Sequence, residues 1–393
     1  DLLVTIAIYR SKGRHYMNKI TNFQMYCIFL VFMGPVAVLE QPHVVIHILA
    51  NNSWLALIAS LFPGLLLIAM YSYIIKKSSQ PFPILLWEHF GAIPGKILGF
   101  YYILVYMLVA AFTLRLFIEF MKMNVLPATP ISVFIGVLLF VGFIAIKLGL
   151  EHLARVSELV SFAGVTLAIL VIIIAIAGNF HPERLKPFFH MDYKTFTLGV
   201  LASTALLGKF APVLMLGFFL PDKNRSYTIM KYLLYTYTFI ITLTTTGILI
   251  TRGVLPSFNL TFPTFSMIRL ARIGTFIQNI DILFIGIVIL GVFAAVAFPW
   301  LLACFTTQKV LGLDDYRFLA APSSLILGIL AILIGSNDLA VVIWSRTIMP
   351  AVYTVSFIFI PLLLFIVTLF KPVPDEAGSD RQSGASNNPD ISS

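Results

Sequence analysis

The sequence contains few charged residues. Asp, Glu, Lys and Arg make up 11% of the 393 residues, against roughly 25% in a soluble domain. Because 59% of the residues are hydrophobic, a soluble protein of this composition would expose large apolar patches and aggregate. This scarcity of charge excludes a soluble enzyme, a nucleic-acid binder and a disordered protein. The sequence predicts an integral, multi-pass membrane protein whose surroundings are the lipid bilayer.

Cysteine is also scarce, and the common motifs of catalysis are missing. Cys27 and Cys304 both lie in apolar stretches, so they predict neither a disulfide framework nor a metal site. No phosphate-binding loop, dinucleotide fingerprint, HExxH or GxSxG motif is present. His43 and His47 are four residues apart but lack a third ligand. We therefore expect no enzymatic activity, no catalytic residue, no metal and no cofactor.

Long apolar stretches are abundant. They predict about ten spans, at roughly 20 to 25 residues each. Because none alternates with a period of two, and lipid leaves no backbone polar group unpaired, the spans are expected to be helices. They cover approximately residues 23–48, 54–75, 98–121, 130–148, 159–177, 198–220, 227–250, 280–305, 320–335 and 348–370.

The two ends of the chain differ from the rest. Residues 1–16 precede a natural-looking start at Met17, and we interpret them as a non-native upstream extension. Residues 17–372 are expected to form a single permease-like domain. Residues 373–393, rich in Ser, Asn, Asp and Gly, predict a disordered cytoplasmic tail. More Lys and Arg residues fall on the side of the N-terminus, which places both termini in the cytoplasm.

Two connections are expected to contain short helices. Residues 82–97 mix apolar residues with Glu88, His89 and Lys96, which predicts an interfacial helix followed by a turn at Pro94 and Gly95. A second short helix is expected near residues 265–273.

Two spans are interrupted near their middle. Residues 33–35 (Met-Gly-Pro) interrupt the first, and residues 208–212 (Gly-Lys-Phe-Ala-Pro) interrupt the sixth. Proline removes a backbone donor, and glycine permits unwinding. If residues 19–177 and 198–370 form inverted repeats, the interrupted helices open the two halves and bring free backbone groups to a midplane ligand site. The alternative is that these residues only kink the helices.

Ionisable residues inside spans are the second signal. Lys209 lies in the sixth span, where a lysine costs about 2.5–3.5 kcal/mol, so it must pair with a carboxylate, reach the interface or contact a ligand. Arg115 and Glu119 are four apart and can pair within one helix.

Other charges lie nearer the span ends. Glu151, Arg155 and Glu158 lie at the start of the fifth span, where they form either a local network or an inner gate. Glu40 and Asp281 lie near the outer ends of their spans, where either can simply be solvated.

Four segments together resemble one family. They are KITNFQMYCIFLVFMG, LPATPISVFIGVLLFVGF, GLEHLARVSEL and NIDILFIG, and they resemble the spore germination permeases, the B subunits of nutrient germinant receptors. That family belongs to the amino acid/polyamine/organocation superfamily. The resemblance extends from about residue 19 to 370. Its most specific parts are Leu-Pro-x-Thr-Pro from Leu126 and Gly-x-Glu-x-x-x-Arg from Gly149.

The resemblance implies an all-α polytopic membrane protein of about ten helices. These would form a five-plus-five inverted repeat of the leucine-transporter type, with discontinuous helices 1 and 6. It also implies a small germinant, an amino acid or a sugar, and a complex with a membrane-embedded A subunit and a lipoprotein C subunit in the spore inner membrane or cell membrane. The implied ligand-binding residues are Met33, Gly34, Pro35, Tyr106, Gly208, Lys209 and Phe210. Candidates for gating or coupling are Arg115, Glu119, Glu151, Arg155 and Asp281.

Two residues depart from the pattern of that family. Lys209 stands where many members have an acidic residue, and Asn279 stands where many have a basic one. A lysine facing the site favours a ligand carboxylate or another anion, but it can equally be paired or mark the loss of ligand binding. Two other functions remain open: an active amino acid/proton symporter with Glu119 or Glu151 as proton carrier, and a scaffold subunit that binds no nutrient.

Overall fold

The computed structural model describes residues 20–78, 80–187, 191–220, 222–270, 280–335 and 338–370. Within these ranges every regular element is a helix, and no strand occurs. The expected extension at residues 1–16, the tail at 373–393 and Asn279 lie outside the described residues.

Membrane-length helices account for most of the described chain. Eight helical stretches are long and apolar enough to cross a bilayer. The first, Asn22–Lys77, has 56 residues, and at 1.5 Å per residue it is long enough to cross twice. Its two parts meet at Ala50, which has a φ of 49°. With the shorter apolar helix Arg317–Leu333, each of the ten predicted spans has a helical counterpart.

The first five spans are built from six helices. They are α2 (Asn22–Leu49), α3 (Ser53–Ala59) with α4 (Leu61–Lys77), α6 (Ala92–Asn124), α7 (Ile131–Leu148) and α8 (Leu150–Gly178). The second five spans contain more interruptions. They are α9 (Tyr193–Leu207) with α10 (Val213–Leu216), α11 (Ser226–Arg252), α14 (Asp281–Leu311), α15 (Ala320–Leu333), and α16 (Asp338–Ile343) with α17 (Met349–Tyr353) and α18 (Ile360–Phe370).

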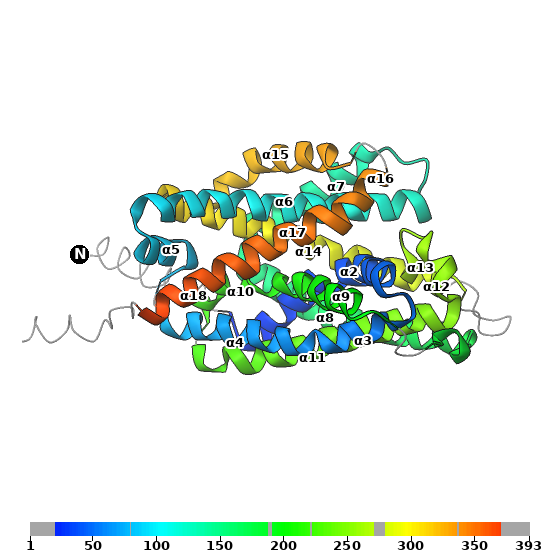
Figure 1. Cartoon of the computed structure of the whole chain (residues 1–393). Helices are drawn as coiled ribbons and strands as arrows, with labels where there is room; N and C mark the ends of the chain where they lie inside the picture. The colour runs from blue at the N-terminus through cyan, green and yellow to red at the C-terminus, as the bar shows by residue number, and fades with distance from the viewer. Residues whose placement is uncertain are drawn as a thin grey trace, which may run out of the picture.

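The long helices run side by side, and the short connecting helices lie at the ends of the bundle (Figure 1). The helix α5 (Phe82–Phe90) lies at one end, whereas α12 (Val254–Phe258) and α13 (Pro263–Ile268) lie at the opposite end. The helices α6, α7 and α15 form one side of the bundle in this view, and α3, α4 and α11 form the other.

The first span differs from expectation in one detail. Helix α2 runs without a break from Asn22 to Leu49, with Pro35 and Pro42 inside it. The expected interruption at residues 33–35 is therefore a proline within a continuous helix. In a membrane, neighbouring groups can satisfy the carbonyl that a proline leaves unpaired. At Pro42 that carbonyl belongs to Val38, and it accepts a hydrogen bond from Thr264 at 2.6 Å.

The two predicted short helices exist, with different ends. The turn after α5 falls at Gly91, with a φ of 94°, and α6 already begins at Ala92. Pro94 and Gly95 therefore lie in the first turn of α6 and not in a turn before it. Proline is tolerated there because the first N–H groups of a helix have no partner within the helix. At the opposite end, α13 begins at Pro263, and residues 271–279 are outside the described ranges.

The last span contains two π-helical turns, η7 (Trp344–Ile348) and η8 (Thr354–Phe359). Each ends two residues before a proline, Pro350 and Pro361. Pro361 cannot donate to the carbonyls of Ser356 and Phe357. Tyrosine hydroxyls occupy those acceptors instead: Tyr102 donates to Ser356 and Tyr71 donates to Phe357, each at 2.5 Å. The widened turn is thus held by α4 and α6.

Candidate functional site

The sixth span is broken where the sequence predicts. Helix α9 ends at Leu207, and a 3₁₀ turn, η3 (Gly208–Phe210), follows. Pro212 cannot donate to the carbonyl of Gly208, and the N–H of Ala211 bonds that oxygen at 2.8 Å instead. The break thus turns Lys209 into the protein interior, where its side chain is 5% exposed.

Glu40 on α2 is the partner of that lysine. The ammonium Nζ of Lys209 lies 3.4 Å from Oε2 of Glu40, whose side chain is 1% exposed. A charge-assisted N–H···O bond is normally 2.7–2.9 Å long, so this contact is stretched. The interpretation of Glu40 as simply solvated is wrong, because the break in the sixth span supplies a buried cation beside it.

The tenth span completes the surroundings of the pair. Ser345 donates a hydrogen bond to the second carboxylate oxygen of Glu40, Oε1, at 3.1 Å. The ring of Tyr353 lies under the ammonium of Lys209, 4.6 Å from Nζ, within the range of a cation–π contact. The buried hydroxyl of Tyr353 has no hydrogen-bond partner within the described part of the chain. An unpaired buried hydroxyl is costly, so this group is available to a ligand.

Aromatic rings link this cluster to the third and seventh spans. Tyr353 stacks on Phe357 with ring centroids 6.0 Å apart. The ring of Phe357 also contacts Tyr106 of α6, with centroids 6.1 Å apart. The ring of Phe210, the residue after Lys209, contacts Tyr237 of α11 with ring centroids 6.1 Å apart. Tyr106 is therefore connected to Lys209 only indirectly, through the rings of Phe357 and Tyr353.

The backbone of the break also contributes. A methyl group added at Gly208 would lie 3.3 Å from the carbonyl oxygen of Tyr353 and 3.4 Å from Cβ of Phe357. The glycine thus allows the sixth and tenth spans to approach closely. The predicted ligand residues Gly208, Lys209 and Phe210 all lie at this contact, and we name the group formed by Glu40, Lys209, Ser345 and Tyr353 the charged cluster.

Gly34 and Pro35 line a different space. They face an apolar pocket between α2, α8 and α14, which contains about 550 Å³ free of protein atoms, part of it open to the outside. Gly34 is about 120° from Glu40 around α2, at 100° per residue. Met33 is completely buried. The predicted ligand residues therefore divide between two places: the pocket at residues 34 and 35, and the charged cluster.

The segment that joins α12 to α13 packs against α2. His43 bonds the carbonyl of Leu260 through Nδ1, and His47 bonds the carbonyl of Phe258 through Nε2, each at 2.8 Å. Arg346 of the tenth span donates to Nε2 of His43 at 2.9 Å. These contacts fasten the α12–α13 connection to the first and tenth spans. The two histidines thus form hydrogen bonds with backbone carbonyls and with Arg346. Among the described residues, no group of three or more metal-ligating side chains occurs.

The predicted gating residues are spread over the bundle. Arg115 and Glu119 form the expected pair within α6, with Nη2 and Oε2 2.9 Å apart and both side chains buried. Asp281 is the first residue of α14 and is partly exposed.

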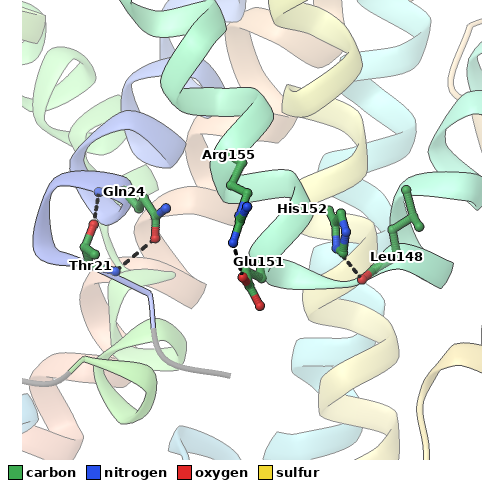
Figure 2. Close-up of polar contacts among 6 residues, drawn as sticks. All are labelled: Thr21, Gln24, Leu148, Glu151, His152 and Arg155. Atoms are coloured by element: carbon green, nitrogen blue, oxygen red, sulfur yellow. Dashed lines mark hydrogen bonds and ion pairs between the residues drawn. The ribbon is translucent and has the colours of Figure 1, made fainter. Parts of the chain in front are cut away.

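Arg155 and Glu151 pair at the start of α8, with Nη2 and Oε1 2.7 Å apart (Figure 2). The start of α2 is drawn in the same view, where Thr21 and Gln24 form a capping box that fixes the first turn. The side chain of Arg155 is 68% exposed, so this pair is a local surface contact, unlike the charged cluster, which is buried.

Sequence reasoning missed two members of the charged cluster, Ser345 and Tyr353. Neither carries a charge, and both lie on the tenth span, whose π-helical turns are not visible in an apolar pattern. Glu40 was visible as an acidic residue in the first span, and pairing it with the buried Lys209 would have found it.

The sequence matches one family over most of its length. The match to the family described as "Spore germination protein" covers residues 19–339. Spore germination protein KB of Bacillus subtilis is 25% identical over 360 residues, which is 90% of this chain and 95% of that protein. The putative spore germination protein YfkT of the same organism is 21% identical over 362 residues, 90% of this chain and 98% of that protein.

Solved transporters share the fold. The crystal structure of MhsT in complex with L-phenylalanine matches with a TM-score of 0.60 at 13% identity, covering 88% of this chain and 97% of that one. Mhp1, a nucleobase-cation-symport-1 family transporter in a closed conformation with bromovinylhydantoin bound, matches with a TM-score of 0.58 at 12% identity, covering 93% and 96%. These matches establish the inverted-repeat transporter fold, and the apolar helices make the chain an integral, multi-pass membrane protein.

Proposed function

This chain belongs to the spore germination protein family, and from that premise we propose that it is the nutrient-binding B subunit of a germinant receptor. The charged cluster supports the proposal most strongly, because it brings a buried cation and a buried anion to the meeting point of the first, sixth and tenth spans. Ligand binding there would favour one of two conformations of the bundle, and partner subunits would respond to that change.

The chemistry of the cluster favours a zwitterionic amino acid over a sugar. A ligand carboxylate can pair with Lys209, and a ligand ammonium can pair with Glu40, in place of their stretched mutual contact. The unpaired hydroxyl of Tyr353 offers a further hydrogen bond. A sugar would leave both charges without a charged partner. The apolar pocket at Gly34 suits neither ligand, since its lining offers almost no polar group.

A thermal-shift screen of amino acids and sugars against the purified protein tests this proposal. We expect an amino acid to raise the unfolding temperature by mass action. Lys209→Met should abolish that response, because the ligand carboxylate would lose its partner. Lys147→Met is the matched control, since Lys147 is exposed at the end of α7, and it should respond as the wild type does. An equal response in both variants would contradict this site.

The transporter fold supports a second candidate, an amino acid/proton symporter. Glu119 in its buried pair with Arg115, or Glu151, would then carry the proton. Accumulation of radiolabelled amino acid in proteoliposomes, driven by an imposed pH gradient and lost in Glu119→Gln, would replace the receptor proposal with this one.

The self-contained pairing of Lys209 with Glu40 supports a third candidate, a scaffold that binds no nutrient. The scaffold and the receptor both predict a complex with a membrane-embedded A subunit and a lipoprotein C subunit, so co-purification alone does not separate them. Only the receptor loses nutrient-triggered germination, while keeping the complex, when Lys209 is changed to Met. We further propose that the complex lies in the spore inner membrane with both termini of this chain in the cytoplasm, from the distribution of Lys and Arg.

A further inference from the structure

The apolar pocket between α2, α8 and α14 has no part in the charged cluster. Three helices each present one stripe to it, residues 30–38 of α2, 160–168 of α8 and 284–291 of α14, and Ile240 of α11 completes the lining. The stripe on α2 extends over about 12 Å of helix. Gly34 and Gly164 leave the space open, and a methyl group added at Gly34 would meet no atom within 4 Å, whereas Gly291 allows α14 to approach the ring of Pro35.

The lining leaves nothing for a polar ligand to bind. Its polar side chain is Ser161, whose hydroxyl already donates to the carbonyl of Glu158 at 3.0 Å. A polar guest would lose its hydrogen bonds to water without replacement. The chemistry of the pocket therefore requires a hydrocarbon guest.

The mouth of the pocket faces the membrane. Ile287 of α14 lines the pocket, and Leu283 and Leu290, on the same face of that helix, are 51% and 59% exposed. On α8, Val165 lines the pocket and Phe162, one turn before it, is 79% exposed. Apolar side chains this exposed in a membrane-spanning bundle contact lipid tails. Membrane lipid is thus the hydrocarbon source that borders the opening.

We propose that this pocket binds one acyl chain of a membrane phospholipid. The chain enters between α8 and α14 and packs against Gly34 and Pro35 of α2. The acyl chain thereby contacts α2, the helix that carries Glu40 six residues after Gly34. It packs on a face of α2 that points away from Lys209. The inference is independent of the germinant site and stands whether or not the charged cluster binds a nutrient.

Photochemical labelling in vesicles tests the proposal. The protein is reconstituted in phosphatidylethanolamine and phosphatidylglycerol that contain a phosphatidylcholine with a diazirine near the middle of one acyl chain. After irradiation, peptide mass spectrometry should find label inside the pocket on Val165 and Val288. Gly34→Leu should lower that labelling severalfold, because its side chain occupies space that the acyl chain would fill and removes the packing contacts made there.

Two further variants keep the test decisive. Gly136→Leu on α7 is the matched control, because a methyl group there also meets nothing within 4 Å and it lies outside the pocket; its labelling should equal that of the wild type. Ala168→Leu fills the pocket from α8 and should lower labelling as Gly34→Leu does. Label confined to outward residues such as Phe162, equal in all variants, would overturn the proposal. So would a diazirine-bearing free fatty acid that labels the pocket more strongly than the phospholipid does.

Discussion

The buried pair of Lys209 and Glu40 allows a quantitative prediction. At 3.4 Å and an effective dielectric constant of 20, two unit charges attract by about 5 kcal/mol, an upper limit that desolvation reduces. Lys209→Met leaves a buried carboxylate without its cation, and Glu40→Gln leaves a buried ammonium without its anion. Each single variant should lose about 3–5 kcal/mol of unfolding free energy, the usual result when one partner of a buried pair is removed.

The double variant should be more stable than the two losses together imply. With both charges gone, neither desolvation penalty remains, so we expect a coupling energy of roughly 2–3 kcal/mol. Equilibrium unfolding in mixed micelles of dodecyl maltoside and sodium dodecyl sulfate measures all four proteins of the cycle. A second cycle that combines Glu40→Gln with Lys147→Met should show no coupling, because Lys147 is exposed at the end of α7. Additive losses in the first cycle, within about 0.5 kcal/mol, would refute the reasoning.

Three further substitutions probe the contacts between helices. Gly291→Ala should lower the unfolding temperature, because its methyl group would lie 2.3 Å from the rigid ring of Pro35; Gly34→Ala, which meets nothing within 4 Å, should leave it unchanged or slightly higher. A larger loss for Gly34→Ala would contradict the packing described. Tyr102→Phe should cost about 1–3 kcal/mol by leaving the carbonyl of Ser356 without its donor. If Tyr102→Phe unfolded at the same denaturant concentration as the wild type, the π-helical turn would not need the tyrosine.

Hydropathy was sufficient to predict the ten spans, because a run of apolar residues as long as the bilayer is thick has no other stable location. The glycine and proline on either side of Lys209 were sufficient to predict the break there, because both residues act on the local backbone. The same rule overpredicted a break at Gly34. Whether a proline interrupts a helix depends on neighbours that donate to the freed carbonyl, as Thr264 does to Val38 before Pro42, and these lie far away in the sequence.

The charged cluster was predicted only in part for a related reason. The buried cation at Lys209 was recognisable from its place within a span, but its partner depended on the register between the first and sixth spans. Glu40 lies 169 residues away, and Tyr353 a further 144 beyond Lys209. Such pairings arise from packing, which a single sequence does not encode in any local pattern.

We propose above all that a nutrient binds between Lys209 and Glu40. A cryo-electron microscopy structure of the protein with the amino acid that raises its unfolding temperature tests this most directly. We predict ligand density between the two side chains, with Nζ and Oε2 separated well beyond their present 3.4 Å. An unchanged pair, with the ligand located elsewhere in the bundle, would contradict the account.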